Sequence, residues 1–261
     1  MVNSQNLKFL ASRTELPINA QMIYRFFIRE LAAVYYMKRN WWKYLGIAFL
    51  LYAIIYGFMV RIPDTPIGES LRNVFYHVGM WFAMMGVLTS SFINSIKFLK
   101  TGDLVYDLKA EQAVRVSFLF GFLGLITGMI WAQFTWGEPW ANDPHLNGAV
   151  VTIIVYAGYM ILRSAITDDE KRGRVAAVLN IFAFVMMLML LGLLPRLAEN
   201  TLHPGSGGNE GGNPAFGDMD TAMRYVFYPA LAGWIMLGLW ITNIRIRIKK
   251  LEKHIEDKDW N

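Results

Sequence analysis

The chain lacks cysteine and has little charge for its size. No cysteine occurs among its 261 residues, which excludes disulfides, thiolate metal sites and a redox-active CxxC pair. Charged residues make up 17% of the chain, whereas soluble domains average about 25%. The charges lie between long apolar stretches, and a stretch of about 20 apolar residues is long enough to cross the hydrocarbon core of a membrane. The composition therefore indicates a membrane protein.

Six apolar spans can be drawn along the chain, and we predict an all-α, polytopic membrane bundle of six transmembrane helices. Before the first span, residues 18–37 mix basic and apolar side chains, which suits a helix on the membrane surface or one packed on the bundle. Arg163 near the end of the fourth span can snorkel to the interface. The Gly-rich tract 205–212 is typical of a flexible linker and not of a phosphate loop. The six predicted spans are 41–60, 74–98, 112–135, 149–166, 175–194 and 222–244.

The positions of the basic residues predict the orientation. Lysines and arginines concentrate in the N-terminal segment, after the second and fourth spans, and in the C-terminal tail. These regions share one side of a six-span bundle, so both termini are expected to be cytoplasmic. The net charge of +5 is thereby explained by topology, without nucleic acid. We predict an N-terminal cytoplasmic or interfacial segment (1–40), a six-helix transmembrane domain (41–246) and a basic cytoplasmic tail (247–261).

Three of the four histidines map to the predicted outer side: His77, His145 and His203. A lone histidine at a helix end is as often structural as functional. Two histidines that reach one side from different helices favour a different interpretation, because neutral imidazoles can clamp haem iron from both faces. Trp81 lies one helical turn after His77 and shares its face. His77 and His203 are therefore candidates to bind haem iron, and the family resemblance described below implies that they are its axial ligands.

A tryptophan-rich loop lies between these histidines and contains Trp136, Gly137, Trp140 and Asp143. Tryptophans at a membrane boundary are also common as interfacial belt residues. This loop has no basic residue and gathers its indoles closely, so it can form an aromatic shelf for a flat porphyrin. Two arginines on the outer side, Arg72 and Arg196, are candidates to pair with propionates, although an arginine near a span end is also an ordinary anchor.

The order of these motifs resembles the CcmC family, the haem-handling members of the cytochrome c maturation system. The resemblance covers most of the chain, from the first span to the sixth. Asn142 stands where a third tryptophan is usual in the family loop, and His145 is an additional histidine for which a capping or solvent-facing role is favoured over a third ligand. The matching residues are Arg72, His77 and Val78, then Trp136, Gly137, Trp140 and Asp143, then Asn200, Thr201, Leu202 and His203.

The resemblance implies a function. A CcmC-like protein in the bacterial inner membrane binds b-type haem transiently at its periplasmic face, through His77, His203 and the loop 136–143. It presents this haem to a CcmE-like periplasmic haem chaperone and works beside a CcmAB-like ABC transporter complex. Haem and membrane lipid are the expected non-protein partners.

Other classes of membrane protein remain as alternatives. A permease or ABC transporter subunit would line its spans with polar residues, and an electron-transfer subunit would hold its histidines inside the bundle. A CcsA-like haem lyase subunit would have more spans and a second pair of outer histidines. No nucleophile–base pair is apparent in the sequence, so we do not expect an enzyme.

Overall fold

The computed structural model describes residues 40–62, 64, 68–198, 201–203 and 219–259. The chain divides into two compact units, Met1–Leu45 and Gly46–Asn261. The first unit contributes only residues 40–45 to the described part. The predicted surface helix over 18–37 and the Gly-rich tract 205–212 lie outside the described residues.

Within the described ranges the regular structure is entirely helical, and six helical stretches are long and apolar enough to cross a membrane. This confirms the predicted all-α, six-span fold. The first stretch is Asn40–Met59. The others comprise η1 (Gly68–Phe75) with α3 (His77–Thr101), α4 (Leu104–Trp136), α5 (Pro144–Ala165), α6 (Asp169–Met187) with η2 (Leu188–Leu193) and α7 (Leu194–Leu197), and α8 (Thr221–Asp259).

Several helices are longer than the apolar spans that predict them. Helix α4 begins eight residues before the predicted start at residue 112, because Asp103 caps it by accepting a hydrogen bond from the backbone N–H of Val105. Gly102, at φ 71°, ends α3 just before this cap. Helix α8 continues through the basic segment after residue 246, where Lys249 and Glu252 pair across one turn at 2.6 Å. Polar caps and ion pairs thus extend helices beyond their apolar cores.

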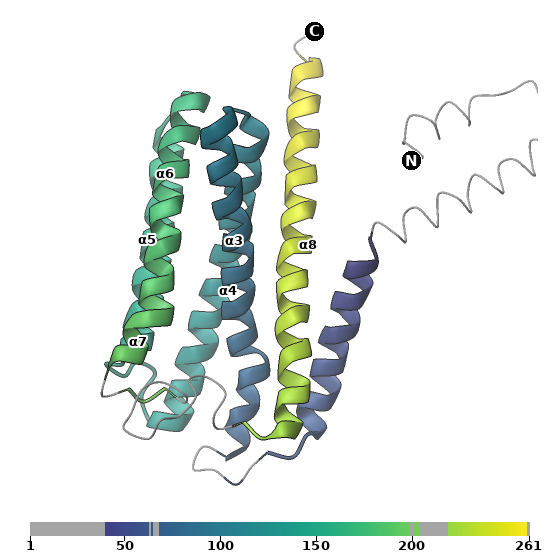
Figure 1. Ribbon diagram of the computed structural model, residues 1–261, viewed down its shortest axis with the longest axis vertical. Coiled ribbons are helices and arrows are strands. Elements are labelled where there is room, and N and C mark those ends of the chain that lie inside the picture. The colour runs from purple at the N-terminus through teal and green to yellow at the C-terminus, as the bar shows by residue number, and fades with distance from the viewer. Residues whose placement is uncertain (1–39, 63, 65–67, 199–200, 204–218, 260–261) are drawn as a thin grey trace, which may run out of the picture. The chain divides into compact units, whose positions relative to one another are not determined.

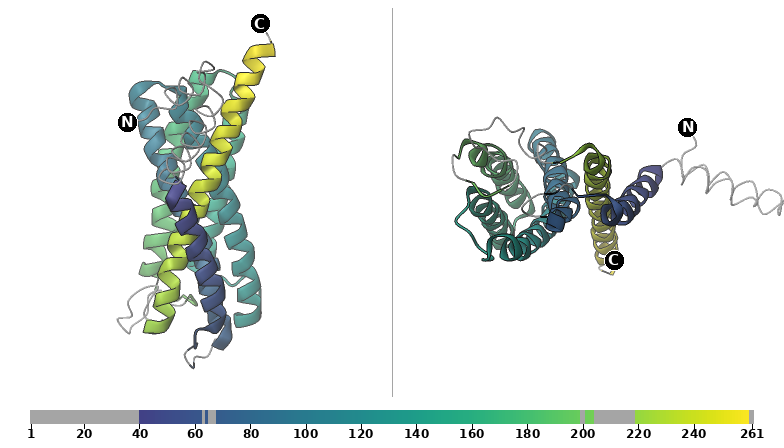
Figure 2. Two further views of the ribbon diagram at one scale, coloured as in Figure 1. Left: turned by 90° about the vertical axis from the view of Figure 1, so that its right-hand side faces the viewer. Right: turned by 90° about the horizontal axis from the view of Figure 1, so that it is seen from below.

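Helix α3 lies at the centre of the second unit and packs against α4, α6 and α8. Figures 1 and 2 show α3 and α4 between the α5–α6 pair and α8. The start of α3, the end of α4, the start of α5, the end of α7 and the start of α8 all lie at the lower end of the bundle in Figure 1. The segments predicted to face the outer side therefore gather at one end of the bundle.

The remaining apolar surface lies on the outside of the helices. Phe134 is 83% exposed, and Ile161 and Phe182 are each 70% exposed. Such large apolar side chains are stable in contact with hydrocarbon and costly in contact with water. The exposed apolar surface thus suits a protein with membrane lipid around its helices.

An ion pair is buried between α4 and α5. Arg163 donates two hydrogen bonds to the Asp107 carboxylate, at 2.8 and 2.5 Å, and lies 3.4 Å from Glu111. Arg163 is 5% exposed and Asp107 is 6% exposed. Contrary to the expectation from the sequence, the arginine stays inside the bundle and does not snorkel to the interface. The reason is the carboxylate on the neighbouring helix, which gives the guanidinium a partner inside the bundle.

Asp107→Asn is expected to destabilise the bundle, because it leaves a buried guanidinium without its main counter-charge. Breaking a buried pair costs up to about 3–5 kcal/mol, whereas an exposed pair contributes about 0–1 kcal/mol. The test is thermal unfolding in detergent, with Asp169→Asn as the matched control, since the Asp169–Arg172 pair is far less buried, with side chains 57% and 28% exposed. Equal shifts in the two variants would show that the buried pair contributes no more than the surface one.

Candidate functional site

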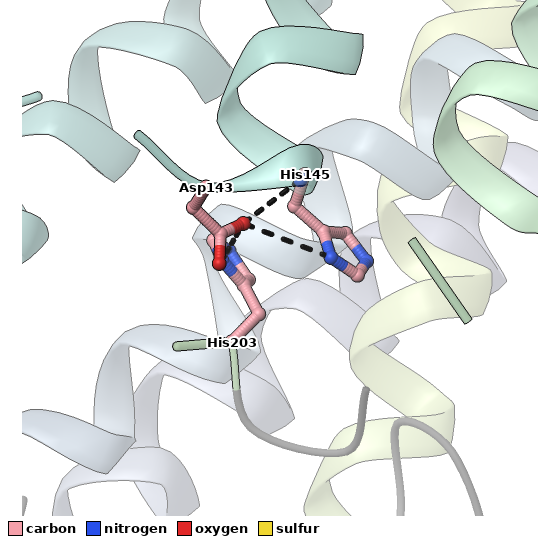
Figure 3. A group of neighbouring side chains, drawn as sticks. All are labelled: Asp143, His145 and His203. Carbon is pink, nitrogen blue, oxygen red and sulfur yellow. Dashed lines mark hydrogen bonds and ion pairs between the residues drawn. The ribbon is translucent and has the colours of Figure 1, made fainter. Parts of the chain in front are cut away.

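The lower end of the bundle brings together residues from two separate parts of the chain. Asp143 and His145 lie at the start of α5, and His203 lies in the segment after α7. Figure 3 shows both imidazoles beside the Asp143 carboxylate. Close approach of α5 to the π-helical segment η2 helps to place them, because a Cβ at Gly148 would lie 2.4 Å from the backbone oxygen of Leu190. A larger residue at Gly148 would push apart the two segments that carry His145 and His203.

Asp143 joins two distant parts of the chain through its carboxylate. One oxygen, Oδ1, accepts the backbone N–H of His145 at 2.8 Å and so caps α5. The other, Oδ2, accepts the hydroxyl of Thr201 at 2.8 Å and the backbone N–H of Leu202 at 2.7 Å. The Asp143 side chain is fully buried. The capping residue of one helix therefore also fixes the segment that carries His203.

The environment of Asp143 keeps it ionised. Burial by itself would raise the pKa of this carboxyl, but the facing His203 imidazole and the three hydrogen bonds just described hold the pKa well below its usual range. The Nδ1 atom of His203 lies 3.3 Å from Oδ1 of Asp143, although it lacks the alignment of a hydrogen bond. Asp143 is thus a fixed negative charge beside an imidazole.

Aromatic rings surround His203. The His145 ring stacks on it, with centroids 4.6 Å apart and planes inclined by 18°. Trp136 meets it edge-on at 5.4 Å, and Trp131 lies 6.3 Å away. The two indoles also contact each other at 5.2 Å. His203 is therefore held in a fixed position by rings from α4 and α5, and its side chain remains 21% exposed.

His77, the first residue of α3, is held from α4. Its Nδ1 atom lies 3.1 Å from the Thr127 hydroxyl, and that hydroxyl donates its one proton to the backbone oxygens of Leu123 or Gly124. The Thr127 oxygen then acts as acceptor, which favours an N–H at Nδ1 and leaves a lone pair on Nε2. The ring lies against Gly128, where a Cβ would be 2.7 Å from Cε1.

The loop between α4 and α5 carries two further predicted residues, Gly137 and Trp140. Gly137, at φ 84°, ends α4 in the left-handed conformation that glycine adopts without strain. Trp140 is 37% exposed, so one indole of the loop presents a free surface. Trp81 lies within the bundle, edge-on to His77 at 6.4 Å. Trp136 and Asp143 therefore surround His203, while Trp81 belongs to the surroundings of His77.

The two predicted arginines lie in different settings. Arg72 donates hydrogen bonds to the backbone oxygens of Gly57 and Val60, at 2.6 and 2.8 Å, and pairs with Glu69. It therefore caps the carboxyl end of the first helix. Arg196 in α7 is exposed, and its charge acts on His145. Arg196 is thus the arginine nearer to the histidine cluster.

With this geometry established, comparison with known proteins places the chain in a family. Residues 27–261 match the sequence model of CcmC, described as heme exporter protein C. The chain belongs to the CcmC family. Membership agrees with the six apolar helices and makes this chain a multi-pass membrane protein with a haem-handling role.

Individual members of the CcmC family are distant in sequence but similar in length. The chain is 28% identical over 195 residues to heme exporter protein C of Paracoccus denitrificans, covering 74% of this chain and 78% of the relative. It is 26% identical over 217 residues to that of Haemophilus influenzae, with coverages of 80% and 83%. The protein of the same description from Escherichia coli K12 is 27% identical over 209 residues, with coverages of 79% and 81%.

Some residues of this CcmC-family site could not be chosen from the sequence. Thr127 lies within the apolar run of α4, and Thr201 is one of many polar loop residues. Their roles depend on partners 50 and 58 residues away in the chain. Of these three residues, Trp131 alone could have been chosen from the sequence, because it lies in the same tryptophan-rich stretch as Trp136. Its indole also reaches Ser70 at 3.3 Å and joins α4 to η1.

Asp143→Asn is expected to destabilise the protein by about 1–3 kcal/mol, because both carboxylate oxygens accept hydrogen bonds and the amide nitrogen would place a donor against a donor. Thermal unfolding of the haem-free protein in detergent measures this. The control is Asp103→Asn, since Asp103 caps α4 through one oxygen and asparagine is an equally good helix cap. Similar stability of the two variants would contradict the double-acceptor role.

Proposed function

We propose that this CcmC-family protein binds haem as a cargo at the end of the bundle where His77 and His203 lie, with these two histidines as axial ligands of the iron. The observation that carries the proposal is the way both imidazoles are held. Each faces a polar protein group through Nδ1, Thr127 for His77 and the ionised Asp143 for His203. Histidines that bind metals are typically held by their second nitrogen in this way, which leaves Nε2 for the iron.

The surroundings of the two histidines suit a porphyrin. Trp136 and the partly exposed Trp140 offer aromatic surface for its flat face. Arg196 is the favoured partner for a propionate, because it is exposed and acts electrostatically on the histidine cluster. Arg72 already binds two backbone oxygens and Glu69, so a propionate role requires it to give up part of this network.

The mode of binding follows from the residues available. Haem attached through thioether bonds requires cysteine, and this chain has none. Thioether attachment is thereby excluded, and we propose non-covalent binding of b-type haem, held by two histidine bonds and aromatic contact. Such binding is reversible by ligand exchange, which suits a protein that passes its haem on. We propose a binding and transfer role in cytochrome c maturation and no catalytic step of its own.

The partners and location follow from the family and the topology. We propose that the chain lies in the bacterial inner membrane with both termini cytoplasmic, and that the haem end of the bundle faces the periplasm. A CcmE-like haem chaperone receives the haem there, and a CcmAB-like ABC complex is the membrane partner. The distribution of basic residues supports this orientation.

Haem binding by the detergent-purified protein tests the proposal. His77→Ala and His203→Ala should each weaken the Soret band after haem is supplied, and the double variant should lose most of it. His254→Ala is the control, because His254 is an exposed residue near the end of α8. Unchanged Soret bands in both single variants would rule out these axial ligands. Transfer of the bound haem to a soluble CcmE-like chaperone, followed by absorption, tests the delivery step.

Thr127→Val should weaken haem binding although the side chain keeps its shape. Valine cannot accept the Nδ1–H of His77, so the ring loses the contact that fixes its tautomer, and affinity should fall by roughly 10- to 100-fold. Thr89→Val is the matched control, because the Thr89 hydroxyl donates only to a backbone oxygen of its own helix. Haem titration followed at the Soret band measures both variants. Equal affinities would show that Thr127 does not position the ligand.

A further inference from the structure

We propose that Asp143, His145 and His203 form a binding site for a divalent transition-metal ion such as Zn²⁺, in addition to the proposed haem site. Each residue offers one ligand atom, and these atoms lie within 4.8 Å of one another. Imidazole and carboxylate are the ligands that zinc takes beside thiolate, and three protein ligands with one open position form a common zinc geometry. Figure 3 shows the Asp143 carboxylate linked by dashed lines to both His145 and His203.

The donor atoms converge on Oδ1 of Asp143. The Nδ1 atom of His203 lies 3.3 Å from this oxygen, and the Nδ1 atom of His145 lies 4.0 Å from it. Tetrahedral zinc, with bonds of about 2.0–2.1 Å, places neighbouring donors roughly 3.3 Å apart. The pair formed by His203 and Asp143 already has this spacing. The His145 ring stacks on the His203 ring with planes inclined by 18°, so it must turn for its Nδ1 atom to point at the same ion. Two of the three donors are thus placed for a metal ion before it binds.

A buried nitrogen without a partner marks the same point. Nδ1 of His203 is buried and makes no hydrogen bond within the described part of the chain. Buried polar atoms are rarely left in this state, because the loss of hydration is then uncompensated. A metal ion between Nδ1 and the carboxylate would give this nitrogen the partner that it lacks. The His145 and His203 side chains are 23% and 21% exposed, so an ion can reach the site from solution.

The metal ion and haem iron exclude each other at His203, a consequence that rests on the proposed function. A neutral imidazole has one nitrogen with a lone pair and one N–H. If zinc takes the lone pair of Nδ1, then Nε2 carries the proton and cannot bind iron. If Nδ1 keeps its proton toward Asp143, then Nε2 is available for iron. Occupation of the metal site therefore closes one of the two haem ligands.

The first test is metal binding by the untagged, haem-free protein in detergent. Calorimetric titration with Zn²⁺ should show one site per chain, and Co²⁺ should give the visible d–d absorption of a site with nitrogen ligands. His145→Phe keeps the ring that stacks on His203 but removes its nitrogen donors. It should weaken zinc binding by about a hundredfold, because loss of even an outer partner of a metal ligand costs roughly 10- to 100-fold.

Controls separate this site from other histidines. His254→Ala removes an exposed histidine outside the cluster and should leave zinc affinity unchanged. His77→Ala should also retain zinc binding, although it loses a proposed haem ligand. Absence of a cobalt spectrum in the parent protein, or equal zinc affinity in the parent and His145→Phe, would overturn the metal site. The cobalt spectrum is measured on the parent protein, so this test remains valid even if a variant folds poorly.

Competition with haem links the two proposals and keeps their failures distinct. Zinc added first should lower haem uptake by the parent and have no such effect on His145→Phe. Zinc binding without any haem binding would sustain the metal site and defeat the proposed function. Haem binding without zinc binding would sustain the proposed function and overturn the metal site. Simultaneous full binding of both would overturn the sharing of His203.

Discussion

The Asp143 carboxylate connects parts of the chain that are separated by almost sixty residues, and the geometry of the site depends on this connection. Asp143 caps α5 through one oxygen and holds Thr201 and Leu202 through the other. Because the group is fully buried and its pKa lies well below the usual range, its charge stays in place beside His203. Without this anchor the segment 201–203 would lose the hydrogen bonds of Thr201 and Leu202 to the start of α5. A single charge-assisted network thus sets the position of a proposed iron ligand.

Other buried polar side chains in the bundle are also paired with side chains on neighbouring helices. Arg163 is buried with Asp107 as its partner, and Asn180 donates hydrogen bonds to Ser91 and Ser95 at 2.8 Å each. An unpaired polar group is costly where water is excluded. Hydrogen bonds are directional, whereas apolar contacts are not. The pairing of these groups between helices therefore fixes how the helices pack more narrowly than apolar contacts alone would. The rigid end of the bundle that carries His77 depends on such contacts, since α3 is held to α4 through Thr127.

The two histidines that we propose as iron ligands are held differently, and the difference has chemical consequences. His77 faces a neutral hydroxyl from an adjacent helix, whereas His203 faces a full negative charge and a second imidazole. A carboxylate beside an imidazole makes it a stronger ligand. Release of a haem cargo would therefore begin more easily at His77 than at His203. The second imidazole, His145, gives the His203 side its proposed capacity for a competing metal ion.

The sequence by itself determined the membrane class, the six spans and the residues from which the proposed site is built. Long apolar runs bounded by polar caps specify helices directly, because the hydrocarbon core demands internal hydrogen bonding over a fixed length. The histidines stood out because ionisable side chains are rare in membrane spans, and the tryptophans because they gather in one loop without a basic residue. The tertiary structure alone decided which of these meet partners from other helices: Trp136 and His145 pack on His203, and Arg163 is buried on Asp107. Such contacts join residues far apart in the chain, and local pattern carries no information about them, since each depends on how whole helices pack and rotate against one another.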